Sequence, residues 1–168
     1  MTLWELNRLS SGAFVTALGD VFEHSPWVAQ RASKKRPFQS VDDLHETMIA
    51  AVWSAPAASQ IALLRAHPEL AGKAALRGEL TAESTLEQSG AGLAHCSAEE
   101  LTRLTALNAA YNAKFGFPFI LAVKGYDRAG ILSEFERRVE RDPSIEFEEA
   151  LKQVARITRF RLDALLGE

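Results

Sequence analysis

Apolar residues recur at helical spacing through almost the whole chain, and this pattern limits the fold more than any other feature. In residues 98–115, one stripe is formed by Leu101, Leu104, Asn108, Tyr111 and Phe115. The single segment that resembles a strand, "PFILAV" (118–123), has no second strand to pair with. We read it as an extended loop or an early helical turn. The pattern predicts an all-α fold, an irregular bundle of roughly seven to nine helices, in a single domain over residues 1–168.

Helix-start and helix-stop residues support this reading. Ser40 can cap a helix over 41–55, and Pro26 stands at a helix-entry position that suits its fixed φ. Residues 97–100, "SAEE", form a capping box, with the serine at the cap and a glutamate three residues on. Gly116 then ends the helix that this box opens.

Composition and charge exclude several classes of protein. With 47% hydrophobic and 24% charged residues, the 168-residue chain is globular and long enough to bury a core. A net charge of -3 and a pI near 5.9 argue against a nucleic-acid surface, since the basic run at 33–37 is short. A single cysteine, Cys96, fits a reducing compartment. No signal peptide and no apolar run of membrane-spanning length is present, so we expect a cytoplasmic protein without membrane contacts.

The motifs for metals and nucleotides fail. "HETMI" begins like a zinc-protease helix, but Ile49 stands where the second histidine must be. "HPE" matches the start of a zinc-deaminase motif, but Cys96 is alone where a cysteine pair is needed. We find no glycine-rich phosphate loop and no nucleophile elbow. The sequence therefore implies neither a metal nor another cofactor.

His67 opens "HPELAGK", directly after the helical pattern of "IALLRA". Pro68 disfavours helical backbone at His67 and fixes its own φ, so the imidazole should leave the helix end in a defined direction. A histidine at a helix C-terminus is also favoured in its protonated form. From the residues alone, His67 is either an exposed or capping histidine or a catalytic group.

A polar face follows in residues 80–93. If 83–89 is helical, Ser84, Glu87 and Gln88 lie at i, i+3 and i+4 on one face. A hydroxyl, a carboxylate and an amide then lie close together. They provide a donor, a charged acceptor and an amide that can donate and accept at once. The alternative is a polar helix face in water.

The last helix carries an arginine within an apolar stripe. Val154, Ile157, Arg161 and Leu165 follow one another at steps of three, four and four residues. An inward arginine needs an acidic neighbour or an anionic ligand, because an unmatched buried charge is very costly. The alternatives are an internal ion pair and a side chain that reaches out to solvent.

Aromatic residues surround a bend in "KFGFPFILAV" (114–123). Phe115, Phe117 and Phe119 bracket Gly116 and Pro118. These rings could belong to the core at a bend, or they could form an apolar wall whose free backbone amides bind a small polar ring.

Taken together, four motifs resemble one known family. "HPELAGK", "STLEQSGAGL", "LNAAYNAKFGFPFILAVKG" and the "RL" of residues 161–162 occur in the order seen in 2-oxo-4-hydroxy-4-carboxy-5-ureidoimidazoline (OHCU) decarboxylases. The resemblance extends from "SSGAFVTALGDVFEHSPWVA" near the start to "RFRLDALL" near the end, without a departure at the motif positions.

This resemblance implies an all-α, cofactor-independent enzyme of uric acid breakdown, usually a homodimer, that converts OHCU to (S)-allantoin and carbon dioxide. By the same resemblance, His67 is the active-site histidine and Glu87 is its carboxylate partner. The substrate contacts that it implies are Pro68, Ser84, Gln88, Phe119, Ile120, Leu121, Val123 and Arg161.

The absence of a cofactor agrees with the chemistry of OHCU. Decarboxylation usually needs an electron sink supplied by a cofactor, but in OHCU the carbon that bears the carboxylate adjoins a C=N bond. We hypothesise that Glu87 fixes the tautomer of His67, whose other nitrogen acts as general base or acid. Two alternatives are a cofactor-free hydrolase of a related ureido ring and a non-enzymatic helical interaction module.

Overall fold

The computed structural model describes residues 1–167, except for the side chain of Ala74, and contains ten α-helices and one 3₁₀ helix in that range. No strand occurs in these residues, so the predicted all-α class is confirmed. Ten helices exceed the expected seven to nine because two short ones, α1 (Leu3–Arg8) and α6 (Lys73–Leu76), have too few residues to show a periodic pattern.

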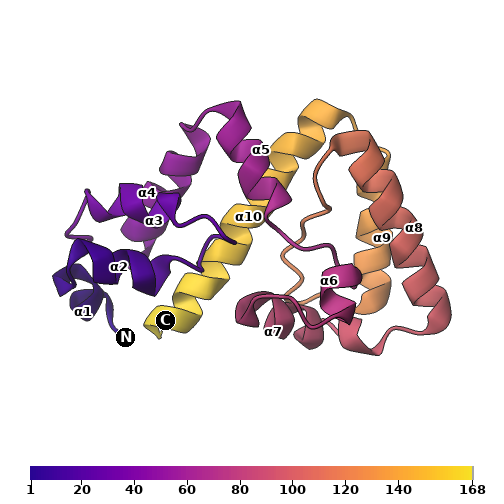
Figure 1. Ribbon diagram of the computed structural model, residues 1–168, viewed down its shortest axis with the longest axis horizontal. Helices are drawn as coiled ribbons and strands as arrows, with labels where there is room; N and C mark the ends of the chain where they lie inside the picture. The colour runs from indigo at the N-terminus through magenta and orange to yellow at the C-terminus, as the bar shows by residue number, and fades with distance from the viewer. Residues whose placement is uncertain (168) are drawn as a thin grey trace. The chain divides into compact units, whose positions relative to one another are not determined.

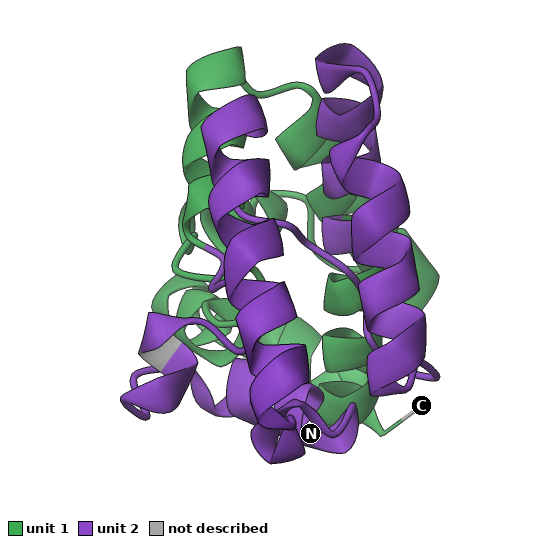
Figure 2. Ribbon diagram, turned by 90° about the vertical axis from the view of Figure 1, so that its right-hand side faces the viewer, with its two compact units in different colours: residues 1–66, 155–168 green, residues 67–154 purple. Residues whose placement is uncertain are grey.

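The chain forms two compact units (Figure 2). Unit 1 consists of residues 1–66 together with the chain from Ala155 onward, and unit 2 consists of residues 67–154. The expectation of a single domain over residues 1–168 stays a prediction. The long helix α10 (Pro143–Leu166) gives its first half to unit 2 and its second half to unit 1.

Unit 1 contains four further helices besides α1, packed around buried leucine, phenylalanine and methionine side chains. They are α2 (Ser11–Leu18), α3 (Trp27–Ser33), α4 (Val41–Trp53) and α5 (Ala57–Arg65). The predicted cap of α4 is confirmed, because the Ser40 hydroxyl accepts a hydrogen bond from the amide of Asp43. Asn7 bridges to a distant loop, since its side chain donates to the carbonyl of Phe38 and accepts from the amide of Phe38, both at 2.9 Å.

Among residues 1–167, no single helix has the length and apolar character needed to cross a membrane. The bent pair α4 and α5 passes that test only when the two helices are taken together.

Unit 2 is built around α8 (Ala98–Phe115), which lies beside α9 (Arg128–Val139) in Figure 1. The predicted capping box at Ser97 and Glu100 is present, and Gly116 ends α8 with a φ of 77°. The smaller elements of the unit are α6, α7 (Ala82–Gly90) and the 3₁₀ helix η1 (Leu93–His95). Aromatic rings fill its core, and Phe119 stacks on Phe135 with their ring centroids 3.9 Å apart.

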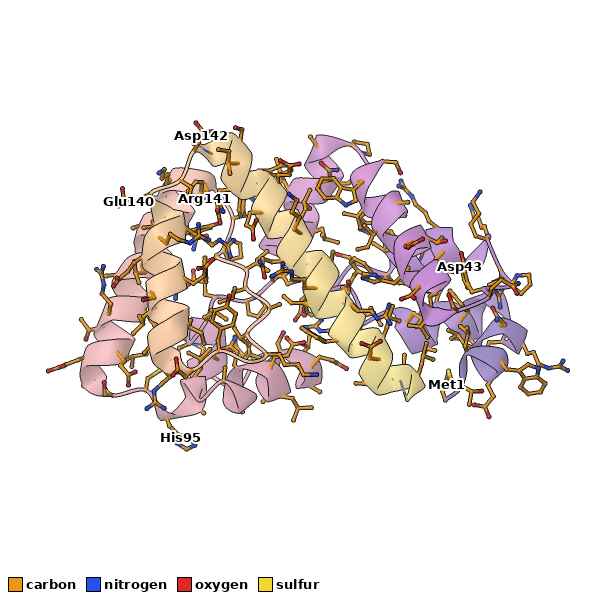
Figure 3. The ribbon with its side chains drawn as sticks, turned by 180° about the vertical axis from the view of Figure 1, so that it is seen from behind. Met1, Asp43, His95, Glu140, Arg141 and Asp142 are labelled. Carbon is orange, nitrogen blue, oxygen red and sulfur yellow. The ribbon has the colours of Figure 1, made fainter. Side chains whose placement is uncertain are left out.

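A fully buried ion pair lies within this core. The Glu146 carboxylate accepts hydrogen bonds from Arg138 (Nε, 2.7 Å) and from the hydroxyl of Tyr111 (2.5 Å). Arg141, at the turn between α9 and α10 in Figure 3, approaches the second carboxylate oxygen of Glu146 at 3.7 Å. Burial and the neighbouring carboxylate raise the pKa of Tyr111, so this residue stays a neutral donor.

We predict that Arg138→Met destabilises the protein by about 3–5 kcal/mol, because it leaves the charge of Glu146 buried without its main partner. The control is Arg103→Ala, which removes an exposed pair with Glu136 and should cost at most about 1 kcal/mol. Urea unfolding measures both free energies. An equal loss in the two variants would contradict the importance of the buried pair.

A second prediction concerns His45 on α4. Burial lowers the pKa of His45, although its Nε2 lies 2.9 Å from the carbonyl oxygen of Ala155. The folded-state pKa is therefore below the unfolded value of about 6.5, and His45 contributes stability that is present above that pH and lost as pH falls. The free energy of unfolding should drop less between pH 7.5 and 5.5 in His45→Gln than in the wild type. An equal drop in His45→Gln and in the wild type would contradict a contribution from His45.

Candidate functional site

His67 begins an irregular loop, residues 67–72, that leads from α5 to α6. Its side chain is buried, with 7% exposed, so the alternative of an exposed histidine is wrong. Ala71 adopts a φ of +49°, which is uncommon for a residue with a Cβ. Gly72 is needed for space, since a Cβ there would come within 2.7 Å of the Glu69 Cβ. The "HPELAG" residues thus form a tight, sterically constrained turn.

Side-chain amides of α7 and α8 hold this loop. Gln88 accepts from the amide of Ala71 at 3.0 Å and donates to the carbonyl of Glu69 at 3.2 Å. Asn108 donates to the carbonyl of Leu70 at 3.0 Å. Three consecutive residues of the loop therefore have a backbone group bound by an amide side chain.

One further amide reaches the loop from α8. Asn112 donates to the carboxylate of Glu69 at 3.0 Å and to the carbonyl of Asn108 at the same distance. Asn108 and Asn112 stand four residues apart, which places them on one face of α8. A pocket of about 390 Å³ borders the loop at Ala71, but His67 is not among its lining residues, so we do not place the site there.

The predicted helix over 83–89 is confirmed as α7, which Thr81 caps by accepting from the amide of Ser84 at 3.2 Å. Ser84 and Gln88 are buried, so the alternative of a polar face in water is wrong for these two residues. Glu87 is half-buried on the same helix, and so is Glu83. Gln88 binds the backbone of the loop that begins at His67, and its role as a substrate contact stays a prediction.

Residues 119–123 of unit 2 form neither a helix nor a strand, and all five are buried. The carbonyl of Ile120 accepts from Arg138 at 2.7 Å, and the amide of Ala122 donates to Gln153 at 3.0 Å. Among residues 1–167, the remaining amides of this stretch have no hydrogen-bond acceptor; they belong to Phe119, Ile120, Leu121 and Val123. Buried amides are normally paired, so this row can donate to a small polar ligand.

Arg161 lies in unit 1, on α10, and is 7% exposed, which confirms its inward orientation. It donates to the carboxylate of Glu23 at 2.8 Å and to the carbonyls of Asp20 and Val21 at 3.2 and 3.4 Å. Of the partners that the sequence left open, the acidic neighbour is therefore present: it is Glu23, on the loop after α2, and the two form an internal ion pair. The role of Arg161 in a site with His67 stays a prediction.

The supporting residues were missed in the sequence. Asn108 falls within the predicted apolar stripe, and no prediction above includes Asn112, Gln153 or Glu23. The signal for the first two was present, because two asparagines four residues apart interrupt an apolar helix face. In the part of the chain that the structure describes, no group of three or more histidine, cysteine or acidic side chains is placed to hold a metal ion.

Known proteins resemble this chain along its whole length. A decarboxylase of the archaeon Haloferax volcanii, named for 2-oxo-4-hydroxy-4-carboxy-5-ureidoimidazoline, is 44% identical over 96% of this chain and 94% of its own. A crystal structure of (S)-allantoin synthase superposes with a TM-score of 0.80 and 29% identity; the match covers 99% of this chain but 54% of that one.

A second solved structure is an OHCU decarboxylase in the presence of (S)-allantoin. It superposes with a TM-score of 0.74 and 25% identity, over 90% of this chain and 99% of that one. A family model of OHCU decarboxylases also matches residues 7–163. By both sequence and fold, the chain belongs to the OHCU decarboxylase family.

Proposed function

We propose that this protein removes the carboxylate of OHCU as carbon dioxide and forms (S)-allantoin, as the names of its relatives indicate. The reaction makes it a carboxy-lyase of uric acid degradation. The observation that carries this assignment to particular residues is the buried His67, fixed at the head of a clamped loop in the unit that also holds Ser84, Glu87 and Gln88.

The electrons of the broken carbon–carboxylate bond flow into the neighbouring C=N bond of the substrate, so the chain itself has to orient the ring and handle protons. Glu87 fixes the tautomer of His67, and the other imidazole nitrogen transfers a proton at the ring hydroxyl or the adjacent carbon. A proton shuttle in the right position contributes about 10²–10⁴-fold to the rate.

The remaining residues bind the substrate. The ureido and carbonyl groups of the substrate need hydrogen-bond donors at fixed positions. These donors are the hydroxyl of Ser84 and the unpaired backbone amides of residues 119–123, and Pro68 contacts the ring. Gln88 has capacity beyond its two loop bonds, since an amide offers two N–H donors and two acceptor lone pairs. Arg161 binds an anionic or carbonyl oxygen while Glu23 holds its guanidinium.

The proposal includes the oligomeric state, the location and the partners of the enzyme. A homodimer is suggested by the family resemblance, and a cytoplasmic location is suggested by the single cysteine. The net charge of -3 argues against a nucleic-acid partner, because a surface that binds nucleic acid is normally basic. OHCU is the only partner that the chemistry requires, with no membrane and no cofactor.

A hydrolase of a related ureido ring is the competing activity, since His67 and Glu87 could instead activate water. The two reactions differ in their products. Carbon dioxide together with (S)-allantoin identifies the decarboxylase, and a ring-opened product without carbon dioxide identifies the hydrolase. A non-enzymatic module would give neither.

The first prediction for the site is that the purified wild-type chain produces (S)-allantoin from freshly generated OHCU and that His67→Asn loses nearly all of this turnover, at least about 10²-fold. The chirality of allantoin is followed by circular dichroism and carbon dioxide release is followed in parallel. The variant should unfold at the wild-type temperature. Turnover near the wild-type level in this variant would exclude His67 as the proton carrier.

The second prediction separates Glu87 from a neighbour on the same helix. Glu87→Gln should lower kcat by about 10–100-fold, since it removes the charge that orients and stabilises the imidazole. The matched control is Glu83→Gln, an equal change of charge one helical turn before Glu87, which should leave kcat within about twofold because the mechanism requires the carboxylate of Glu87 itself. Equal losses in the two variants would remove Glu87 from the mechanism.

A further inference from the structure

Asn108 is a buried amide in a position where an apolar residue would continue the stripe of α8. Its neighbours along that stripe, Leu104 and Tyr111, are almost wholly buried, and Asn108 is 3% exposed. Its Nδ2 donates to the carbonyl of Leu70 at 3.0 Å. Its Oδ1 is buried and has no hydrogen-bond partner among residues 1–167. An amide whose Oδ1 has no partner in the core is unfavourable for stability, so its presence at this position needs another explanation.

The loop that Asn108 binds has no regular backbone structure of its own. Among residues 1–167, no turn or loop hydrogen bond joins a backbone group of residues 68–71 to another backbone group. The carbonyls of Glu69 and Leu70 and the amide of Ala71 are bound by Gln88 and Asn108 instead. The place of these peptide groups is therefore set by side chains of α7 and α8.

The position of these peptide groups determines where the backbone of His67 lies. Pro68 is the single residue between His67 and Glu69, and its ring locks its φ. The same ring restricts ψ at His67. Few soft dihedral angles remain between the clamped carbonyls and the Cα of His67, so a displacement of the loop moves the imidazole.

We propose that Asn108 is a positioning residue of the active site, which sets the imidazole of His67 through the carbonyl of Leu70. Asn112 assists it by holding the Glu69 carboxylate. The inference rests on the proposed function for the assignment of His67 to catalysis. The clamp itself rests on the hydrogen bonds of the loop.

The test replaces Asn108 with leucine, which has nearly the same shape, suits the apolar stripe and lacks the donor. We expect kcat for OHCU to fall about 10–100-fold with KM changed less than about threefold, since a displacement near 1 Å costs up to about 10²-fold. The thermal midpoint should fall less than in the Asn7→Leu control, since Asn108 gives one hydrogen bond to a loop backbone and Asn7 makes two. The pH profile of kcat/KM should shift on the limb that His67 controls.

The matched control is Asn7→Leu in unit 1, which also removes an asparagine that bridges a loop backbone, at Phe38. It should lower the thermal midpoint and leave kcat and the pH profile unchanged. If Asn108→Leu lowers the midpoint and leaves kcat and the pH profile at wild-type values, the residue is structural and the proposal is wrong.

A measurement without substrate separates this proposal from the proposed function. Hydrogen exchange of the Ala71 amide and the NMR signal of the His67 ring report on the loop directly. In Asn108→Leu the amide should exchange faster and the ring signal should move, whereas Asn7→Leu should change neither. Unchanged exchange and ring signal would overturn the clamp even if turnover falls. Inactive wild-type protein with a disturbed loop in the variant would overturn the proposed function and leave the clamp supported.

Discussion

An irregular loop in a protein interior has peptide groups that no helix or strand can satisfy, and unit 2 meets this requirement with amide side chains. Asn and Gln offer a donor and an acceptor on one rigid group, so they can substitute for the missing backbone partners. The loop of His67 takes three such bonds on consecutive residues, 69 to 71. Without them the burial of this loop would be unfavourable, because an unpaired peptide group loses its hydration without replacement.

The buried segment 119–123 has the same requirement, and there a charged side chain, the guanidinium of Arg138, binds the backbone in place of an amide side chain. Arg138 donates to the carbonyl of Ile120, packs its guanidinium 4.4 Å from the centre of the Phe119 ring and pairs with Glu146. A buried ion pair gives little net stability, but it has directional donors. Its function in this fold is therefore geometric: it fixes one edge of residues 119–123, and Gln153 binds the amide of Ala122.

The sequence predicts the helices of this protein better than it predicts the contacts between them. Helix caps are local, so Ser40, Ser97 and Gly116 could be assigned from a few neighbouring residues. The buried faces of α8 and α10 could be predicted from the periodicity of their apolar residues. The partner of Asn108 could not be assigned, because Leu70 is 38 residues away. The inward direction of Arg161 was predictable from its stripe. Its partner Glu23, 138 residues away, was not, since pairing across such a separation depends on the fold.

The Glu23–Arg161 pair also bears on how a decarboxylase should bind its substrate. During the reaction the negative charge leaves the carboxylate and moves into the ring, so a cation that strongly stabilises the carboxylate favours the bound substrate over the transition state. Glu23 balances the charge of Arg161 while leaving a planar guanidinium with defined donor directions. We propose that Arg161 binds a substrate oxygen. Its pairing with Glu23 then allows Arg161 to orient the ring with little net electrostatic stabilisation of the carboxylate that leaves as carbon dioxide.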